Sequence, residues 1–377
     1  MSTIKRRHRV VKPVRMSPIE KARGREAGYQ VGYDEGYLKG RADYIFRTHS
    51  VTFPFRQLHI LYVTSGKGFP YSPIDEAISS TLRGMVAQLT VIEPGQLGSE
   101  VVNQVMPDLV LVLDGMYVPN DQLDAVRKLG FKTAVWLTDD PYYSDLTVGN
   151  VSHYDYVFTL ESECIPIYQQ LGCSQVHHLP FAAYPGHYKP IGMPSIRRRE
   201  VSFIGSAYLN RIDYLNPIMD RLMQHNTIIN GLWWDRLPSY TAYGDRIEVN
   251  KWMDPVQTAE TYSASKIVIN LHRSHEDHSV NYNTTQIPAA SPNPRTFEIS
   301  ACGTLQLSDY RSDLTKFYTP GKEIETYRSP AELIDKIEYY LTHEKERRDI
   351  ALGALERTLG EHTYGHRLNQ MLSVIFA

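Results

Sequence analysis

Residues 295–309 combine residue types that suit the binding of a charged, hydroxylated ligand. Their sequence, RTFEISACGTLQLSD, is typical of a short helix that ends at Gly303 and leads directly into a strand. Arg295 and Glu298 would lie at the start of that helix, beside free backbone N–H groups and the positive end of the helix dipole. Together these groups can bind phosphate and hydroxyls, as in a nucleotide-sugar. The alternative is an ordinary αβ unit with a surface salt bridge.

The same region resembles a known family of enzymes. The residues that carry the resemblance are 297–303, 309–310, 320–323 and 361–364. Their order and spacing are similar to the C-terminal domain of glycosyltransferases of the spore maturation protein CgeB type, over roughly residues 200–370. The resemblance implies an α/β protein with the GT-B fold and a GT4-like C-terminal domain. In that fold two Rossmann-like domains face each other across a cleft, the donor binds mainly to the C-terminal domain, and no metal or other cofactor is required.

The resemblance also assigns residues to the donor site. Glu298 corresponds to the glutamate that holds the ribose hydroxyls of the donor, and Asn293 and Arg295 are expected beside it. Many related retaining enzymes carry a second glutamate eight residues before the first, and Ala290 occupies that position here. The sugar and the choice between retention and inversion therefore stay open.

Further donor-binding candidates follow other strands of the C-terminal half. The run VSFIGS predicts a strand that ends in a turn at Gly205 and Ser206, a geometry that suits the close approach of a pyrophosphate. Arg211 would lie one helical turn further on, as a phosphate ligand or as a surface arginine. Lys251 is another possible phosphate contact, and His272 could face the cleft from a strand end. A metal site built from His272 and its neighbouring histidines is disfavoured, because a closed zinc site needs four well-placed ligands, their spacing fits a loop no better than a helix, and the resembling family is metal-independent.

The N-terminal half offers candidates for the acceptor and for phosphate. Gly66 and Lys67 lie in a glycine-rich turn after the first predicted strand, where an ordinary βα turn is as good an explanation. Asp139 and Asp140 follow the fourth strand in the run WLTDDPY, which resembles a segment of CgeB-type N-terminal domains. We expect Asp140 to face the cleft as the general base for an acceptor hydroxyl, with Asp139 as the alternative. Either aspartate could instead cap the following turn. Asp114, after the third strand, is a weaker candidate.

Alternating strands and helices must position these residues. Apolar runs predict strands at 58–63, 89–92, 109–113, 133–137 and 156–159, with helices near 73–87, 119–129 and 161–171 between them. This order favours a parallel sheet covered by helices, which binds ligands beyond the carboxyl ends of its strands.

The predicted organisation has six parts. They are a basic flexible tail (1–16), a helix with a glycine repeat (17–46), an N-terminal Rossmann-like acceptor domain (47–185), a proline-punctuated linker (186–199), a C-terminal Rossmann-like nucleotide-sugar domain (200–360) and a helix that crosses back to the first domain (361–377).

Composition agrees with the expectation of a soluble two-domain enzyme. The 377 residues are 42% hydrophobic and 22% charged, which allows two cores of ordinary size. No apolar run is long enough to span a membrane, and no apolar segment follows the basic N-terminus as in a secretory signal. Three cysteines without metal-ligand pairing favour a reducing cytoplasm. The family name extends this to the mother-cell cytoplasm or the spore surface.

The N-terminal segment differs from the rest. Residues 1–25 contain nine Lys or Arg and one Glu, which is typical of a solvated tail, and no nucleic-acid-binding motif accompanies them. Glycines then recur every four residues from Gly24 to Gly40, with a tyrosine after three of them. On a helix this spacing produces one bare stripe, and glycine costs about 1 kcal/mol per helical site relative to alanine. Residues 17–46 are therefore expected to mediate self-association or docking on another protein; a flexible linker is the alternative.

The sequence thus predicts a metal-independent glycosyltransferase that uses a nucleotide-diphosphate-sugar, preferably a UDP-sugar, and an unknown acceptor. Two alternatives stay open. One is a catalytically degenerate coat or scaffold protein, to which the alanine at position 290 lends support. The other is a sugar-nucleotide epimerase, which needs no separate acceptor.

Overall fold

The computed structural model describes residues 17–49, 51–249 and 251–377. The chain forms two units, Met1–Arg41 and Ala42–Ala377. The basic tail predicted over residues 1–16 lies outside the described residues.

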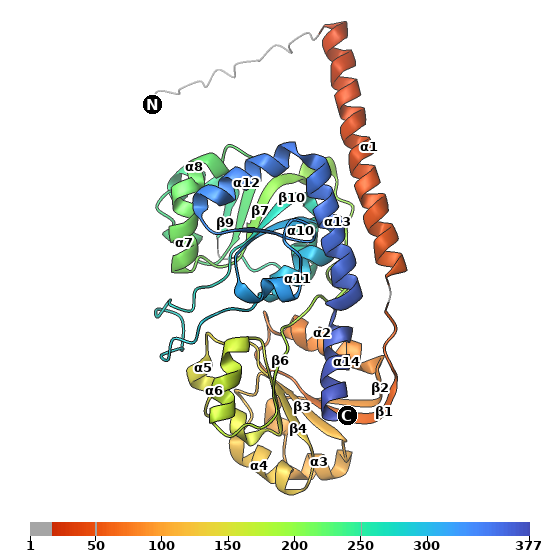
Figure 1. The fold of residues 1–377 in the computed structure, drawn as a ribbon, viewed down its shortest axis with the longest axis vertical. Coiled ribbons are helices and arrows are strands. Elements are labelled where there is room, and N and C mark those ends of the chain that lie inside the picture. The colour runs from red at the N-terminus through yellow and green to blue at the C-terminus, as the bar shows by residue number, and fades with distance from the viewer. Residues whose placement is uncertain (1–16, 50, 250) are drawn as a thin grey trace, which may run out of the picture. The chain divides into compact units, whose positions relative to one another are not determined.

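Helix α1 (Pro18–Thr48) supplies the described part of the first unit and continues into the second (Figure 1). Its N-terminus is capped reciprocally: the Glu20 N–H donates to Ser17 Oγ, and the Ser17 N–H donates to a carboxylate oxygen of Glu20. Within residues 17–41, a methyl group added to any of the repeating glycines would meet no heavy atom within 4 Å. The tyrosines that follow three of these glycines are exposed. The predicted helix is therefore present, and within this segment its glycine stripe is an open face.

The second unit contains two parallel six-stranded sheets, each flanked by helices (Figure 1). In the first domain the strands run in the order β2-β1-β3-β4-β5-β6. Its strands are β1 (Arg56–Val63), β2 (Val86–Ile92), β3 (Leu109–Leu113), β4 (Thr133–Trp136), β5 (Tyr156–Thr159) and β6 (Val176–His178). Its helices are α2 (Ser72–Arg83), α3 (Ser99–Val105), α4 (Asn120–Lys128), α5 (Ser144–Thr147) and α6 (Ile165–Gln170). The strand order reverses between β1 and β3, so a crevice is expected where these two strands end.

The second domain has the strand order β12-β11-β10-β7-β8-β9, with the reversal between β7 and β10. Its strands are β7 (Arg199–Ile204), β8 (Thr227–Gly231), β9 (Ile247–Val249), β10 (Ser265–Asn270), β11 (Leu305–Asp309) and β12 (Glu325–Tyr327). Its helices are α7 (Leu209–Leu215), α8 (Met219–Leu222), α9 (Tyr240–Tyr243), α10 (Pro255–Ala264), α11 (Pro294–Ala301), α12 (Pro330–Thr342) and α13 (Glu344–Glu361).

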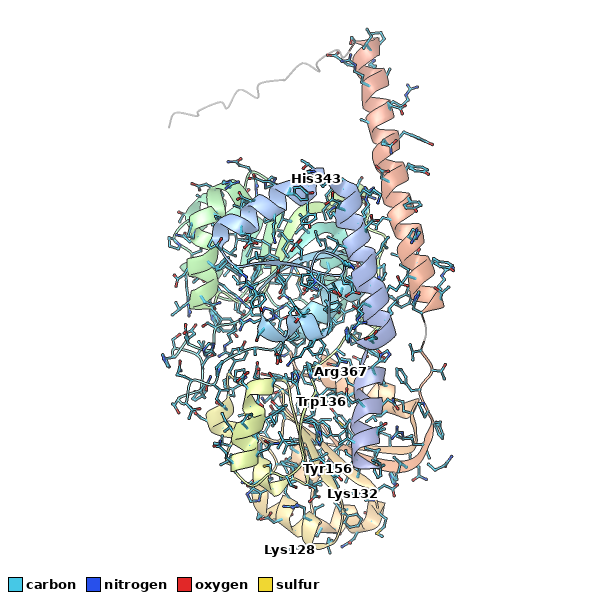
Figure 2. The ribbon with its side chains drawn as sticks, viewed as in Figure 1. Lys128, Lys132, Trp136, Tyr156, His343 and Arg367 are labelled. Carbon is cyan, nitrogen blue, oxygen red and sulfur yellow. The ribbon has the colours of Figure 1, made fainter. Side chains whose placement is uncertain are left out.

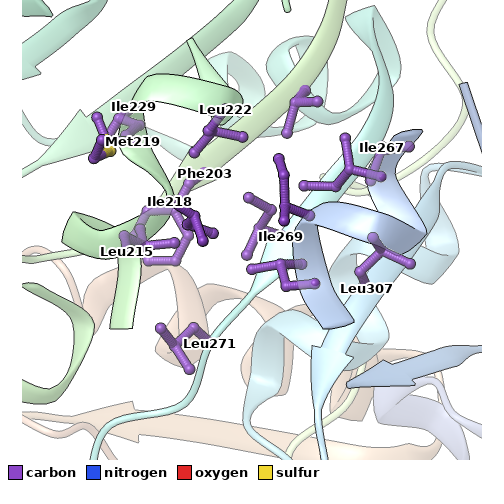
Figure 3. Packing of buried hydrophobic residues seen from close by; sticks show 14 of the residues in the cluster. Phe203, Leu215, Ile218, Met219, Leu222, Ile229, Ile267, Ile269, Leu271 and Leu307 are labelled. Atoms are coloured by element: carbon purple, nitrogen blue, oxygen red, sulfur yellow. The ribbon is translucent and has the colours of Figure 1, made fainter. Parts of the chain in front are cut away.

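Each sheet has its own buried core, because parallel strands are covered on both faces. All five residues of β3, Leu-Val-Leu-Val-Leu, are buried. Figure 2 labels Trp136, the last residue of β4, whose indole N–H donates to the Leu179 carbonyl at 2.8 Å. In the second domain Phe203, Ile229 and Ile269 from three strands pack against residues 215–222 (Figure 3).

The last helix, α14 (Tyr364–Ile375), packs into the core of the first domain. Its apolar side is built from Leu368, Met371, Leu372 and Ile375, the spacing of one helix face. Where the chain returns, the Ala183 N–H donates to the His362 carbonyl, and the Tyr364 N–H donates to the Ala183 carbonyl. The segment that leaves the first domain at Ala183 and the segment that returns to it at 362–364 are therefore joined by backbone hydrogen bonds. No helix in the described ranges is long and apolar enough to cross a membrane.

Candidate active site

A cavity of about 380 Å³ opens where strands of both sheets end, and residues of both domains line it. From the first domain come the segments after β1, β4 and β5, and from the second come the segments after β7, β8 and β10. Of the residues predicted for the site, nine line this cavity: Asp139, Asp140, Gly205, Ser206, Lys251, His272, Asn293, Arg295 and Glu298. The structure therefore brings most of the predicted donor and acceptor residues together.

Helix α11 begins at the cavity wall. Asn293 is its N-cap, and its side-chain oxygen accepts the Thr296 N–H at 3.0 Å. Pro294 follows at the first helical position, where the missing N–H costs nothing. Arg295 and Glu298 therefore project from the first two turns, as the sequence predicts. Burial raises the pKa of Glu298 to about 7, against the opposing effects of Arg295 and of a hydrogen bond from Tyr188.

His272 supports the start of helix α11 by a hydrogen bond to its N-cap residue. Its Nε2 accepts the backbone N–H of Asn293 at 2.9 Å, so its proton must lie on Nδ1, which donates to Asp309 Oδ1 at 2.5 Å. Burial lowers the pKa of His272, although Asp309 opposes this shift, so the ring stays neutral near pH 7. Burial alone would raise the pKa of Asp309, but His272 and Arg311 lower it overall. The histidine lines the cavity, and its ring nitrogens hold Asn293 and Asp309 in place.

The turn after β7 approaches the neighbouring strand closely. A Cβ at Gly231, the last residue of β8, would lie 2.1 Å from the Gly205 carbonyl oxygen, and Gly231 has φ +150°. The indole N–H of Trp234 also donates to that oxygen at 2.7 Å. Only glycine fits at position 231, because both the space and the backbone angle exclude a side chain. This packing sets Gly205 and Ser206 against the cavity.

Arg211 is placed differently from the prediction. It does not line the cavity: Nε donates to the Leu271 carbonyl and Nη1 to the Ser206 carbonyl, both at 2.9 Å. Burial lowers its pKa to about 9, with a further effect of Arg295. The sequence interpretation of a phosphate ligand or a surface arginine is therefore not supported. The guanidinium of Arg211 instead links the segments that follow β7 and β10, because it donates to a backbone carbonyl of each.

Gly66 and Lys67 also lie outside the cavity lining. The Lys67 ammonium lies 2.9 Å from Asp114 Oδ1 and 3.6 Å from Asp139 Oδ2, so two carboxylates already neutralise it. The residues concerned follow β1, β3 and β4, at the point where the strand order of the first sheet reverses. A direct contact between Lys67 and the donor, as predicted, is not supported. Lys67 instead forms ion pairs with Asp114 and Asp139.

The two adjacent aspartates have different surroundings. Asp140 is buried, and both its oxygens accept hydroxyl hydrogens: Tyr168 donates to Oδ1 at 2.8 Å and Thr159 to Oδ2 at 2.6 Å. Burial raises its pKa to about 6. Asp139 is partly exposed, and the hydrogen bonds from Tyr71 and Thr138 both reach Oδ2. Both aspartates line the cavity. Among the described residues, Asp140 accepts hydrogen bonds at both carboxylate oxygens and Asp139 only at Oδ2, which favours Asp139, the alternative of the sequence analysis, as the base.

Lys251 lines the cavity but is exposed, 3.4 Å from a carboxylate oxygen of Glu248. The next residue, Trp252, meets Phe69 of the first domain edge to face, with ring centroids 5.9 Å apart. Both rings are about half exposed and line the cavity. An aromatic pair thus bridges the two domains at this side of the cavity.

Sequence reasoning missed Glu161. This residue follows β5, is buried and lines the cavity. Its Oε2 accepts the backbone N–H groups of Ala290 and Ser291, each at 3.0 Å, across the domain boundary. The rule applied to other strands, to examine the residues just after each strand end, would have flagged it. Ala290 itself is buried, and the carboxylate that its backbone N–H contacts comes from the other domain.

The metal site considered for the histidines after His272 finds no support in the geometry. Within the part of the chain that the structure describes, no group of three or more His, Cys, Asp and Glu side chains could hold a metal ion.

Comparison with known proteins agrees with this architecture. Residues 211–373 match the family described as glycosyl transferase-like. Spore protein CgeB from Bacillus subtilis (strain 168) is 28% identical over 309 residues, which cover 81% of this chain and 95% of that one.

Two solved structures share the fold at low identity. Anabaena HepE in complex with UDP and glucose is 13% identical, covers 85% of this chain and 100% of its own, and has a TM-score of 0.59. Sucrose-phosphate synthase from Thermosynechococcus elongatus is 12% identical, covers 85% of this chain and 99% of its own, and has a TM-score of 0.58.

The two parallel sheets, the cavity between them and the matching family define a glycosyltransferase with the GT-B fold. The resemblance to CgeB-type proteins that was read from residues 297–303 and the later motifs is confirmed by the similarity to spore protein CgeB.

Proposed function

We propose that this glycosyltransferase takes its sugar from a UDP-sugar and does so without a divalent metal ion. The observation that carries the proposal is the start of helix α11, where Arg295 and Glu298 face the same cavity as the Gly205–Ser206 turn. A guanidinium and the N-terminal end of α11 can balance the charge on a leaving diphosphate. The uridine base is favoured because HepE, which shares the fold, binds UDP.

Glu298 would hold the ribose, and its surroundings suit that task. A carboxylate accepts hydrogen bonds from the two ribose hydroxyls, and Arg295 beside it favours the ionised form. His272 and Asn293 set the position of both side chains by fixing the first turn of α11. Lys251, at the exposed side of the cavity, can approach a phosphate from solvent.

Asp139 would act on the acceptor. Its free oxygen can accept the proton of a hydroxyl, while Lys67, Tyr71 and Thr138 hold its other oxygen. The half-exposed rings of Phe69 and Trp252 offer flat apolar surface beside it. The acceptor itself stays unidentified, and a role in the spore surface or coat is proposed by analogy with spore protein CgeB.

The test is a thermal-shift panel of UDP, GDP, dTDP and CDP, with and without EDTA, on the wild type and on Glu298→Gln. A ligand at 100 times its Kd stabilises the fold by about 2.7 kcal/mol, which shifts the Tm measurably. We expect a shift with UDP that EDTA does not change and that Glu298→Gln removes. Glu163→Gln, a substitution of an exposed glutamate, is the matched control and should keep the shift.

Other outcomes would change the proposal in defined ways. A shift with another diphosphate alone would replace the base, and a shift lost in EDTA would contradict metal independence. No shift with any of the four would overturn the donor site and favour the scaffold alternative. Incubation with UDP-glucose separates transfer from epimerisation, because a transferase releases UDP and an epimerase returns a second UDP-sugar.

A further inference from the structure

The connection between β10 and α11, residues 271–293, leaves the second domain and docks on the first. Its Tyr282 carbonyl accepts the Asp145 N–H at 2.9 Å, and its Tyr282 N–H donates to the Tyr142 carbonyl at 2.8 Å. Thr284 adds a hydroxyl hydrogen bond to Asp145 at 2.9 Å. Ile287 is buried in the hydrophobic core of the first domain. The chain thus packs against the first domain immediately before it forms helix α11, which carries the proposed donor residues.

The return of this connection to the second domain is fixed on both sides. The second domain holds its carbonyl groups: Arg311 Nη1 donates to the Ala289 carbonyl at 2.5 Å, and the Asp313 N–H donates to the Ala290 carbonyl at 3.1 Å. The first domain holds its amides, because Glu161 Oε2 accepts the N–H groups of Ala290 and Ser291. The backbone at 289–291 is therefore bonded to one domain through its oxygens and to the other through its nitrogens.

Glu161 is suited to hold these amides and little else. Its Oε1 accepts the hydroxyl of Ser291 and the Glu163 N–H, each at 3.2 Å. With both oxygens occupied and the side chain buried, it has no acceptor capacity left for a sugar hydroxyl. A buried carboxylate that accepts several backbone N–H groups is a rigid anchor, because releasing any of them leaves a buried polar group without a partner.

The residues that Glu161 anchors, Ala290 and Ser291, come directly before the proposed donor site in the chain. Ser291 is two residues before the N-cap Asn293, and Arg295 and Glu298 follow in the first turns of α11. A shift of 290–291 would therefore move the N-cap and the two charged side chains together. We propose that Glu161, a residue of the acceptor domain, is a positioning residue for the donor: it sets the start of α11 across the domain boundary.

The consequence is a dependence of donor binding on the contact between the domains. If the first domain moved away from the second, Glu161 would no longer accept the N–H groups of Ala290 and Ser291. The first turn of α11 would then be held in position less firmly. The protein would then have to reorder this turn when the donor binds, and the cost appears as weaker affinity. The inference rests on the proposed donor site, with UDP as the ligand.

The experiment compares wild type with Glu161→Gln by two readouts. Hydrogen exchange of peptides covering 286–297 reports on the amides without any ligand, and calorimetric titration with UDP gives the Kd. Glutamine keeps the size of the side chain but turns an NH₂ group or a single oxygen toward the two N–H donors. We expect faster exchange at 290–293 and a UDP Kd about tenfold weaker. Glu163→Gln, two residues away and exposed, removes the same charge and should change neither.

Each other result has a defined meaning. If Glu161→Gln exchanges like wild type, or binds UDP within about twofold of wild type, the inference is overturned. Weaker binding with unchanged exchange at 290–293 overturns it too, because Glu161 would then act by another route. If wild type itself does not bind UDP, the donor proposal fails, while the exchange data still show whether Glu161 holds the segment. Should Glu161→Gln fail to fold, Glu161→Asp, which keeps the charge but shortens the reach, replaces it with the same two expectations.

Discussion

The imidazole of His272 and the carboxylate of Asp309 form a hydrogen-bonded pair beneath the cavity, with Nδ1 2.5 Å from Oδ1. Asp309 also accepts the backbone N–H of His272 at 2.9 Å. The pair therefore fixes the ring in one tautomer, and that tautomer leaves Nε2 free to accept the N–H of Asn293. A carboxylate at the end of β11 is thus linked to the start of α11 through a histidine that follows β10.

Asp309→Asn should loosen this arrangement. We expect the free energy of unfolding to fall by about 2 kcal/mol, because hydrogen bonds to a charged group are lost. UDP should bind several-fold more weakly, because the ring no longer has a unique tautomer to present to Asn293. Urea denaturation and calorimetric titration measure the two effects. Asp335→Asn, an exposed substitution on α12, is the control and should stay within about 0.5 kcal/mol of wild type.

The tautomer can be read directly. In ¹⁵N spectra of wild type, His272 should carry its proton on Nδ1 near pH 7. A proton on Nε2 would show that the ring cannot accept the Asn293 N–H, and the bracing role of His272 would be wrong.

Glu298→Gln should make the protein more stable and a worse ligand binder. Burial raises the pKa of Glu298 from an ordinary value near 4.5 to about 7, so the folded state binds more protons than the unfolded state between these values. Stability attributable to this group therefore falls as pH rises from about 4.5 to 7. At pH 8 the variant should exceed wild type by about 3 kcal/mol, and below pH 4.5 the difference should vanish.

The same ionisation governs affinity. The carboxylate form accepts the ribose hydroxyls, so UDP should bind wild type more tightly at pH 8 than at pH 6, and Glu298→Gln should bind weakly at both. Denaturation at pH 5 and 8 and titration at pH 6, 7 and 8 measure this. A variant that is no more stable than wild type at pH 8 would contradict the burial cost assigned to Glu298.

Asp139→Asn and Asp140→Asn should separate catalysis from structure. Asp139 has a free oxygen at the cavity, and loss of a general base lowers turnover by about 10²-fold or more. Asp140 is enclosed by hydroxyls that can rotate to suit an amide, so its substitution should leave turnover within a few-fold. UDP release from UDP-glucose, with water as acceptor, measures turnover, and UDP affinity should be the same in both variants. A larger loss of turnover in Asp140→Asn would restore the original assignment.

Gly28→Ala with Gly32→Ala tests the open stripe of α1. Alanine is favoured over glycine by about 1 kcal/mol at each helical site, so the helix itself should become more stable. If a partner helix packs on the stripe, the added methyl groups should instead abolish self-association, because they prevent close approach. Sedimentation velocity of the full chain measures the oligomeric state, and Gln30→Ala, off the stripe, is the control. A wild type that is monomeric, or a variant that associates as well as wild type, would contradict self-association through this helix.

Much of the architecture could be predicted because it depends on local pattern. Runs such as Leu109–Leu113 are apolar enough to be buried on both faces of a sheet, and their alternation with helices leaves few topologies. The start of α11 was predictable for a similar reason: an N-cap asparagine, a proline and a glycine beyond the end delimit the helix within a few residues. Arg295 and Glu298 therefore reached the cavity as expected.

The sequence by itself determined the resemblance to CgeB-type proteins, the alternation of strands and helices, and the helix that carries Arg295 and Glu298, because each of these is encoded within short segments. Tertiary structure decided that Asp140 is the aspartate whose two carboxylate oxygens are both hydrogen-bonded, since the hydroxyls around it come from three later segments. It also decided that Arg211 is enclosed by carbonyls and that Glu161 holds amides 129 and 130 residues away. Backbone groups carry no sequence signature, so contacts made to them appear only once the chain has folded.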